Sequence, residues 1–221
     1  MKISLQNVGK RFNRDWIFRA LTYEFTTGTW YAITGPNGSG KSTLLQVIGG
    51  ATLHNEGEIS YKTLEHYITP EKVYKNIAIA APYLELIEEL TLVEFLNLHA
   101  NLKGWIDQIC TPLIITILGL NHSSDKQLRY FSSGMKQRVK LAQAIFSNVP
   151  ILLLDEPITN LDEEGIALYH HMVKTYCNDR LVIVSSNDKS EYDFCTEIIN
   201  IKNYKQLPPG DKNRQSPILP S

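Results

Sequence analysis

The stretch Gly35-Pro36-Asn37-Gly38-Ser39-Gly40-Lys41-Ser42 fits the pattern G-x-x-x-x-G-K-[ST]. It follows the β-branched and aromatic run at 29–34, which predicts a strand, and it precedes 42–48, which predicts a helix. Glycines let the backbone of such a loop curl so that its N–H groups point inward, and the helix N-terminus adds partial positive charge. The sequence therefore predicts a phosphate-binding loop between a strand and a helix.

Two side chains at the end of this loop have separate expected roles. Lys41 supplies a full cation to the β- and γ-phosphates of a nucleotide, and Ser42 offers its hydroxyl to Mg²⁺. The alternative is an ordinary glycine-rich turn between a strand and a helix. The residues that we expect to bind the nucleotide are Gly35, Pro36, Asn37, Gly38, Ser39, Gly40, Lys41, Ser42 and Thr43.

A second element, Ile151-Leu152-Leu153-Leu154-Asp155-Glu156, places two carboxylates after a continuous apolar run. Such a run is typical of a parallel strand covered on both faces, and its C-terminal end lies beside the phosphate loop in a parallel sheet. We expect Asp155 to hold Mg²⁺ through water and Glu156 to position or deprotonate the water that attacks the γ-phosphate. The alternative is a strand that simply enters a charged turn.

Predicted strands alternate with predicted helices along the chain, which indicates a layered α/β domain with a mainly parallel sheet. Besides the elements above, the expected strands are 3–8, 16–25, 57–61, 76–81, 181–185 and 197–201. The expected helices are 91–103, 112–118, 134–147, 163–176 and a short one at 189–193, with Thr111 as an N-cap.

Composition excludes several classes of protein. The 221 residues include 43% hydrophobic and 20% charged residues with a net charge of −1, so we expect a packed domain and no nucleic-acid partner. The three cysteines, which we expect to be small buried residues, lack the spacing of a zinc site or disulfide framework, which fits a reducing cytosol. No apolar run approaches the length needed to cross a bilayer. Any role at a membrane therefore requires a partner.

Three motifs, GPNGSGKST, FSSGMKQRVKLAQAIF and ILLLDEPITNLD, occur in this order. With them the chain resembles, over about 3–201, the nucleotide-binding subunit of an ABC-type ATPase. The resemblance implies a P-loop NTPase with a mainly parallel central sheet and an N-terminal antiparallel β subdomain. It also implies a helical subdomain, about 88–147, inserted between the phosphate loop and the signature. We expect one domain over 1–205 and a disordered tail at 206–221.

The resemblance implies a head-to-tail dimer in which each ATP lies between the phosphate loop of one subunit and the signature of the other. The signature residues are Ser132, Ser133, Gly134 and Met135. By the same resemblance Phe12 stacks on adenine, with Trp16 as the alternative, and Asp162 belongs to a loop that crosses the dimer interface.

The sequence departs from the family pattern at three places. Ser133 and Met135 replace the usual glycine and glutamine of the signature. The glutamine that normally follows a strand and touches the metal is absent, and Pro82 or Tyr83 occupies its region. Asn187 replaces a histidine that contacts the γ-phosphate and, lacking positive charge, should stabilise the transition state less well. Alternatively, Asn187 only caps the short helix that follows it.

The resemblance implies a Mg²⁺-dependent ATPase subunit, slow because the glutamine and histidine are missing, that uses ATP and Mg²⁺. Its expected partners are membrane-spanning transporter subunits and a second ATP-binding subunit in a homodimer or heterodimer, which would hold it at the cytoplasmic face of the membrane. Two alternatives stay open: a regulatory half-site with little hydrolysis, and a soluble ABC ATPase without a role in transport.

Overall fold

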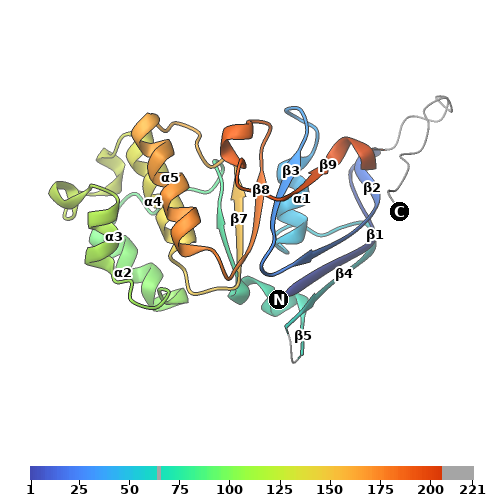
Figure 1. The fold of residues 1–221 in the computed structure, drawn as a ribbon, viewed down its shortest axis with the longest axis horizontal. Coiled ribbons are helices and arrows are strands. Elements are labelled where there is room, and N and C mark those ends of the chain that lie inside the picture. The colour runs from blue at the N-terminus through green and yellow to red at the C-terminus, as the bar shows by residue number, and fades with distance from the viewer. Residues whose placement is uncertain (64–65, 206–221) are drawn as a thin grey trace.

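In a computed structural model, which describes residues 1–63 and 66–205, the strands form two sheets (Figure 1). The antiparallel sheet has the order β2-β1-β4-β5, with bounds Asp15–Thr26, Lys2–Phe12, Glu56–Lys62 and Tyr67–Ile68. The parallel sheet has the order β6-β7-β8-β3-β9, with bounds Ile77–Ala80, Ile151–Asp155, Leu181–Ser185, Trp30–Thr34 and Glu197–Asn200. The expected tail at 206–221 lies outside the described residues.

The five strands of the parallel sheet confirm the α/β architecture predicted from the alternating pattern. The apolar run of β7 is continuous because both faces of the strand are covered: Leu152 and Leu154 belong to one hydrophobic cluster, and Ile151 and Leu153 to the other. The sheet therefore separates two hydrophobic cores. Because its strands are parallel, their C-terminal ends all lie on the same side of the sheet.

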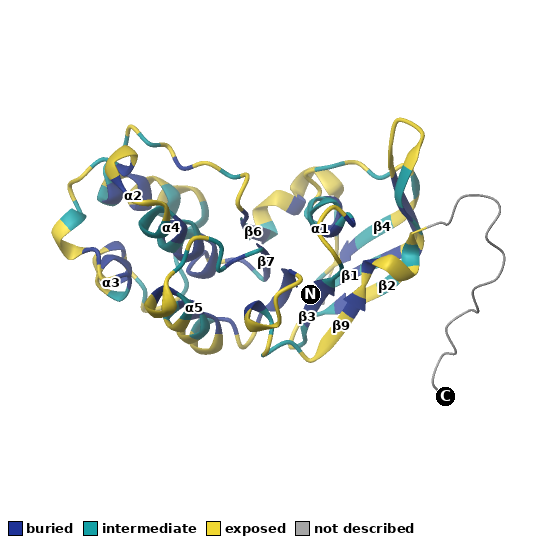
Figure 2. Cartoon of the chain, turned by 90° about the horizontal axis from the view of Figure 1, so that it is seen from above, coloured by how far each residue is buried: buried dark blue, intermediate teal, exposed yellow. Residues whose placement is uncertain are grey.

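The helices cover the parallel sheet on both faces (Figures 1 and 2). Helix α1 lies between the two sheets, whereas α2 to α5 gather on the other side of the parallel sheet. The bounds are Lys41–Ile48 for α1, Leu92–Lys103 for α2, Thr111–Ile117 for α3, Ser133–Ile145 for α4 and Glu163–Tyr176 for α5. Short 3₁₀ turns occupy Pro70–Asn76, Asn121–Ser123, Leu128–Tyr130, Lys189–Glu191 and Ile201–Tyr204.

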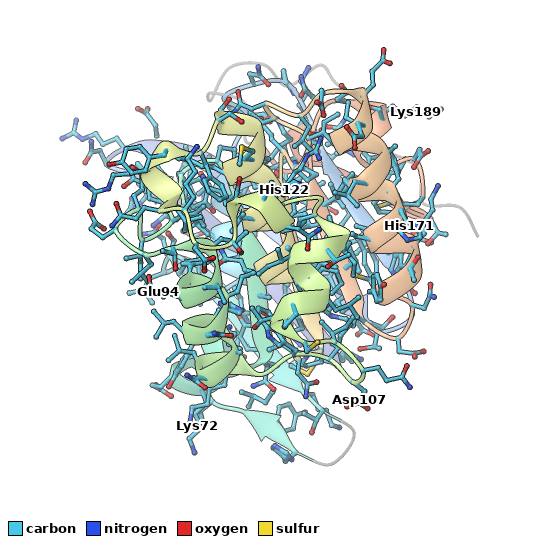
Figure 3. The ribbon with its side chains drawn as sticks, turned by 90° about the vertical axis from the view of Figure 1, so that its left-hand side faces the viewer. Lys72, Glu94, Asp107, His122, His171 and Lys189 are labelled. Atoms are coloured by element: carbon cyan, nitrogen blue, oxygen red, sulfur yellow. The ribbon has the colours of Figure 1, made fainter. Side chains whose placement is uncertain are left out.

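Local signals account for where the helices of the second layer begin. Thr91 and Glu94 form a reciprocal capping box at the start of α2, and Asp162 accepts a hydrogen bond from the N–H of Gly165 at the start of α5. Figure 3 views this helical end, where Glu94 and His122 lie at the surface. In the described ranges, no helix combines the length and apolar character that crossing a membrane requires.

Three sequence-based expectations are wrong in detail. Thr111 is not the N-cap of α3 but its first residue, and its buried hydroxyl accepts a hydrogen bond from the indole of Trp105. The helix expected at 189–193 is a single 3₁₀ turn that ends at Glu191. Among the cysteines Cys177 is buried, but Cys110 is exposed and Cys195 half-buried.

Candidate functional site

The loop between β3 and α1 can be built only with glycine at its end. Gly40 has a φ of 103°, and a Cβ at this position would clash with Cγ2 of Ile17. Gly38 also has a left-handed φ, of 73°, with open space around it. An L side chain at Gly40 would therefore bring both backbone strain and a collision with the β1–β2 hairpin.

Lys41 is held beneath this loop. It is 4% exposed, and its Nζ donates hydrogen bonds to the carbonyl oxygens of Gly35 at 3.0 Å and Pro36 at 3.4 Å. The hydroxyl of Ser39 is buried and has no hydrogen-bond partner among the described residues. A hollow of about 210 Å³ opens over the loop, lined by residues 37–43, Ile17 and Glu156. A buried cation and an unpaired hydroxyl at one hollow fit a phosphate group.

Asp155 ends β7 and is 1% exposed. Its Oδ1 has no hydrogen-bond partner in the described part of the chain, and burial raises the pKa of Asp155 while the hydroxyls of Ser185 and Ser42 lower it. A buried carboxylate oxygen without a partner, close to the hydroxyl of Ser42, fits the oxygen donors that Mg²⁺ prefers. Within 1–63 and 66–205, no three His, Cys, Asp or Glu side chains form a metal cluster.

Glu156 follows Asp155 in a left-handed conformation with a φ of 43°. Its N–H donates to the carbonyl oxygen of Ser185 at 2.9 Å. Glu156 lines the hollow over the phosphate loop and also a second hollow, of about 360 Å³, together with Asn37 and Asn187. The structure thus brings the two expected catalytic residues to one space, which the phosphate loop borders.

Asn187 is not the cap of the turn that follows it. Asp188 has that role, because its Oδ1 accepts a hydrogen bond from the N–H of Ser190 at 2.9 Å. The alternative of a purely capping Asn187 is therefore wrong. The exposed amide of Asn187 stays available at the edge of the second hollow.

The signature residues lie elsewhere. Ser132 to Met135 line a third hollow, of about 330 Å³, with Arg138, Asn160 and Asp162. The hydroxyl of Ser132 caps α4 by accepting the N–H of Met135 at 3.2 Å. A side chain at position 134 would be crowded, since a Cβ added to Gly134 would lie 3.1 Å from the carbonyl oxygen of Asn160. One chain therefore does not bring its own signature into its phosphate-loop hollow.

Asp162 lies at the rim of the signature hollow. It accepts the N–H of Gly165 at 2.8 Å and pairs with Arg138 at 3.0 Å, and these two groups, Gly165 first, lower the pKa of Asp162. The carboxylate is thus held ionised where α4 and α5 begin.

Two aromatic rings lie near the turn of the β1–β2 hairpin. Phe12 is 50% exposed, with Nζ of Lys10 at 4.7 Å from its ring centroid. Trp16 is contacted by the guanidinium groups of Arg11 and Arg19, at 5.4 and 4.6 Å from its ring centroid. Neither ring lines the phosphate-loop hollow, which Ile17 borders.

Tyr83 lies after β6, in the region where the glutamine of the family pattern is missing. The N–H of Leu84 donates to the carbonyl oxygen of Ala81 at 3.2 Å, which closes a turn with Pro82 and Tyr83 at its centre. Burial raises the pKa of Tyr83, a hydrogen bond with Gln46 lowers it, and the charge of Asp155 raises it.

One buried acid of this region gave no recognisable signal in the sequence. Glu191 is 3% exposed and lines the second hollow with Asn187 and Glu156. The sequence places Glu191 within the short helix expected at 189–193, and this assignment says nothing of its burial.

Comparison with known proteins gives consistent matches. A family model described as "ABC transporter" matches residues 18–159. The ABC transporter ATP-binding protein YybJ of Bacillus subtilis strain 168 is 30% identical over 217 residues, which cover 95% of this chain and 96% of that protein. The cytochrome c biogenesis ATP-binding export protein CcmA of Xylella fastidiosa strain 9a5c is 33% identical over 160 residues, with coverage of 72% and 71%.

Among solved structures, the dimeric structure of MJ0796, a bacterial ABC transporter cassette, superposes with a TM-score of 0.76 at 23% identity. The superposition covers 90% of this chain and 94% of the MJ0796 chain. This likeness bears on the fold alone.

Proposed function

The chain belongs to the ATP-binding proteins of ABC transporters, and from this premise we propose that it is a Mg²⁺-dependent ATPase subunit that couples ATP-driven dimer closure to separate membrane subunits. The observation that carries the proposal is the convergence of Lys41, Asp155 and Glu156 at the phosphate-loop edge of the parallel sheet. Phosphate, metal and attacking water would each find a group of suitable chemistry there.

The phosphate loop binds the triphosphate of ATP. Lys41 already spans the loop through the carbonyl oxygens of Gly35 and Pro36, so its charge is placed before the ligand arrives. The N–H groups of the loop and the start of α1 add donors on the same side. Phe12 supports the adenine better than Trp16 does, because two guanidinium groups already contact the Trp16 ring.

Asp155 and the hydroxyl of Ser42 hold the metal. When bound, Mg²⁺ neutralises charge on the β- and γ-phosphates. Asp155 is suited to this because its unpaired Oδ1 is buried, and Ser42 because it is the second residue of α1, next to Lys41. The side chain of Glu156, one residue further on, orients a water molecule and accepts its proton.

Hydrolysis should be slow. Asn187 can donate a hydrogen bond to the γ-phosphate but brings no positive charge, so less of the charge that develops in the transition state is stabilised. The glutamine that would touch the metal is absent from the segment after β6, which holds Pro82 and Tyr83 instead. Both departures affect the chemical step more than ATP binding.

Two subunits complete the site. The signature residues of one protomer, at the N-terminus of α4, contact the γ-phosphate of the ATP held by its partner, and Asp162 lies at the crossing loop. The separate hollow that the signature lines supports this arrangement. We propose that 1–205 forms one nucleotide-binding domain whose helical subdomain, about 88–147, contacts a membrane-spanning partner at the cytoplasmic face of the membrane.

One experiment tests this function. The purified protein is mixed in excess with radiolabelled MgATP, and single-turnover release of phosphate is followed together with dimer formation by size-exclusion chromatography. We expect slow but complete hydrolysis and a dimer in the ATP-bound state. Binding without turnover would favour the regulatory half-site, which Asn187 and Pro82 support. Failure to bind ATP would overturn the proposal.

A second measurement separates transport from a soluble role. An affinity-tagged copy is recovered from detergent-solubilised membranes and from the supernatant of the same cells, and co-purifying proteins are identified. A stoichiometric membrane-spanning partner supports the transporter subunit. Exclusive recovery from the supernatant without such a partner would favour the non-transport ATPase.

A further inference from the structure

Glu191 is the last residue of the 3₁₀ turn Lys189–Glu191, which is separated from Asn187 only by its cap, Asp188. Lys189, at the start of the turn, points outward in Figure 3, whereas Glu191 is 3% exposed. A carboxylate loses hydration when it is buried, so its position requires compensating hydrogen bonds. The contacts of Glu191 show which segments provide them.

Three segments meet at Glu191. Its Oε1 accepts the backbone N–H of Ile158 at 2.9 Å, two residues after Glu156. Its carbonyl oxygen accepts the hydroxyl of Tyr169, on α5, at 2.8 Å. Its own N–H donates to the carbonyl oxygen of Asp188 at 3.1 Å. One residue thus joins the segment of Glu156, the segment of Asn187 and the helix that begins after Asp162.

The charges around Glu191 oppose its ionisation. The pKa of Glu191 is raised to about 7: burial raises it most, the hydroxyl of Ser186 and the N–H of Ile158 lower it, and the charges of Glu156 and Asp188 raise it. Tyr169, whose hydroxyl donates to the carbonyl oxygen of Glu191, is also titratable. Burial raises the pKa of Tyr169 far above its usual value. A neutral side chain would suit this place better for stability, since a buried acid among acids is unfavourable.

The backbone beside this contact is itself unusual. Glu156 is left-handed, with a φ of 43°, and Asn160 is left-handed, with a φ of 65°. Non-glycine residues keep such conformations where their surroundings hold them. The contact from Glu191 to Ile158 falls between these two positions. It is therefore placed to hold the path of the chain from Glu156 to Asp162.

Resting on the proposed function, we propose that Glu191 is a positioning residue for hydrolysis: its carboxylate fixes the segment after Glu156 against the Asn187 segment. The side chains of Glu156 and Asn187, which act on the γ-phosphate, are then held at a fixed distance from each other. Glu191 does not line the phosphate-loop hollow, so its loss should slow the chemical step and leave ATP affinity unchanged.

The test compares Glu191→Ala, which removes the acceptor, with Glu191→Gln, which keeps an oxygen for the N–H of Ile158. Single-turnover hydrolysis at saturating MgATP, the Kd for a fluorescent ATP analogue and amide exchange at Ile158 are measured on each. Tyr61→Phe serves as a control, since it removes one buried hydrogen bond, to Ile48, far from both segments.

We expect Glu191→Ala to slow hydrolysis by about tenfold to hundredfold, as misplaced reacting groups do, at unchanged Kd. It should also lose exchange protection at Ile158, whereas Glu191→Gln retains both rate and protection. The Tyr61→Phe variant should be less stable with a normal rate per folded molecule. Equal rates for the alanine variant and the parent, or a Kd that weakens in step with the rate, would overturn the inference.

The exchange measurement keeps this inference separate from the proposed function. A parent protein that hydrolyses no ATP overturns the function, yet exchange at Ile158 still decides the contact. Protection that is lost in Glu191→Ala and kept in Glu191→Gln supports the tie between the two segments. Protection that does not change overturns it.

Discussion

The N–H of Glu156 donates to the carbonyl oxygen of Ser185 at 2.9 Å, one residue beyond the last pair of the β7–β8 ladder, Asp155 and Ser185. This bond extends the contact between the strands just where the backbone of Glu156 turns left-handed. The carboxylate is thereby placed at a hollow shared with Asn37 and Asn187 instead of continuing along β7. Several predictions rest on this geometry and on the loop beside it.

Lys41→Ala should abolish tight ATP binding, because the Lys41 Nζ is the cation held across the phosphate loop. Loss of a charged hydrogen-bond donor costs about 2–3 kcal/mol, which corresponds to roughly a 30-fold to 150-fold rise in Kd. Titration with a fluorescent ATP analogue measures this, with the exposed Lys72→Ala as the matched control. Equal affinity of Lys41→Ala and the parent would remove the phosphate-loop assignment.

Glu156→Gln should bind ATP normally and accumulate as an ATP-bound dimer. The amide keeps the shape of the side chain but cannot accept the proton of the attacking water, so turnover should fall about a hundredfold or more. Size-exclusion chromatography with and without MgATP shows the dimer, and steady-state assays give the rate. The exposed Glu71→Gln should behave as the parent does. A parental rate in Glu156→Gln would mean that another group is the base.

Asn187→His should raise turnover about fivefold to hundredfold, since a better donor to a charged group contributes about 1–3 kcal/mol in the transition state. The melting temperature should change little, because Asp188 and not Asn187 caps the following turn. Steady-state hydrolysis and thermal melting on one preparation check both statements. An unchanged rate would show that residue 187 does not contact the γ-phosphate.

Glu191 should also make stability depend on pH. Its pKa rises to about 7 in the folded chain, against about 4.3 unfolded, so the native state binds the extra proton between these values. The free energy of unfolding therefore falls as pH rises through this window. Relative to the parent, Glu191→Gln should gain about 2 kcal/mol between pH 5 and pH 8.

Urea unfolding of Glu191→Gln and the parent at both pH values measures this difference. Because other titrating groups are common to both proteins, they cancel in the comparison. A difference that is the same at pH 5 and pH 8 would contradict the raised pKa of Glu191.

Much of the fold and part of the site follow from local patterns. The loop 35–42 and the apolar strand before Asp155 are recognisable because glycine spacing and burial on both faces leave a direct mark in the sequence. The helix predicted at about 163–176 from the alternation of strands and helices has the observed bounds Glu163–Tyr176. The expected bounds differ from the observed ones at Thr111, which is the first residue of α3, and at 189–193, where the 3₁₀ turn ends at Glu191.

Local sequence patterns are enough to locate the phosphate loop and the pair Asp155 and Glu156, because each lies within one short segment, and the alternation along the chain predicts the layered order of strands and helices. The folded chain is needed to show that the signature lines a hollow of its own and that Glu156 shares another hollow with Asn187. The same holds for the contact of Glu191 with Ile158, 33 residues earlier in the chain. Such contacts depend on how the C-terminal ends of separate strands come together in the folded chain. The sequence of one short segment does not show which distant residues will meet there.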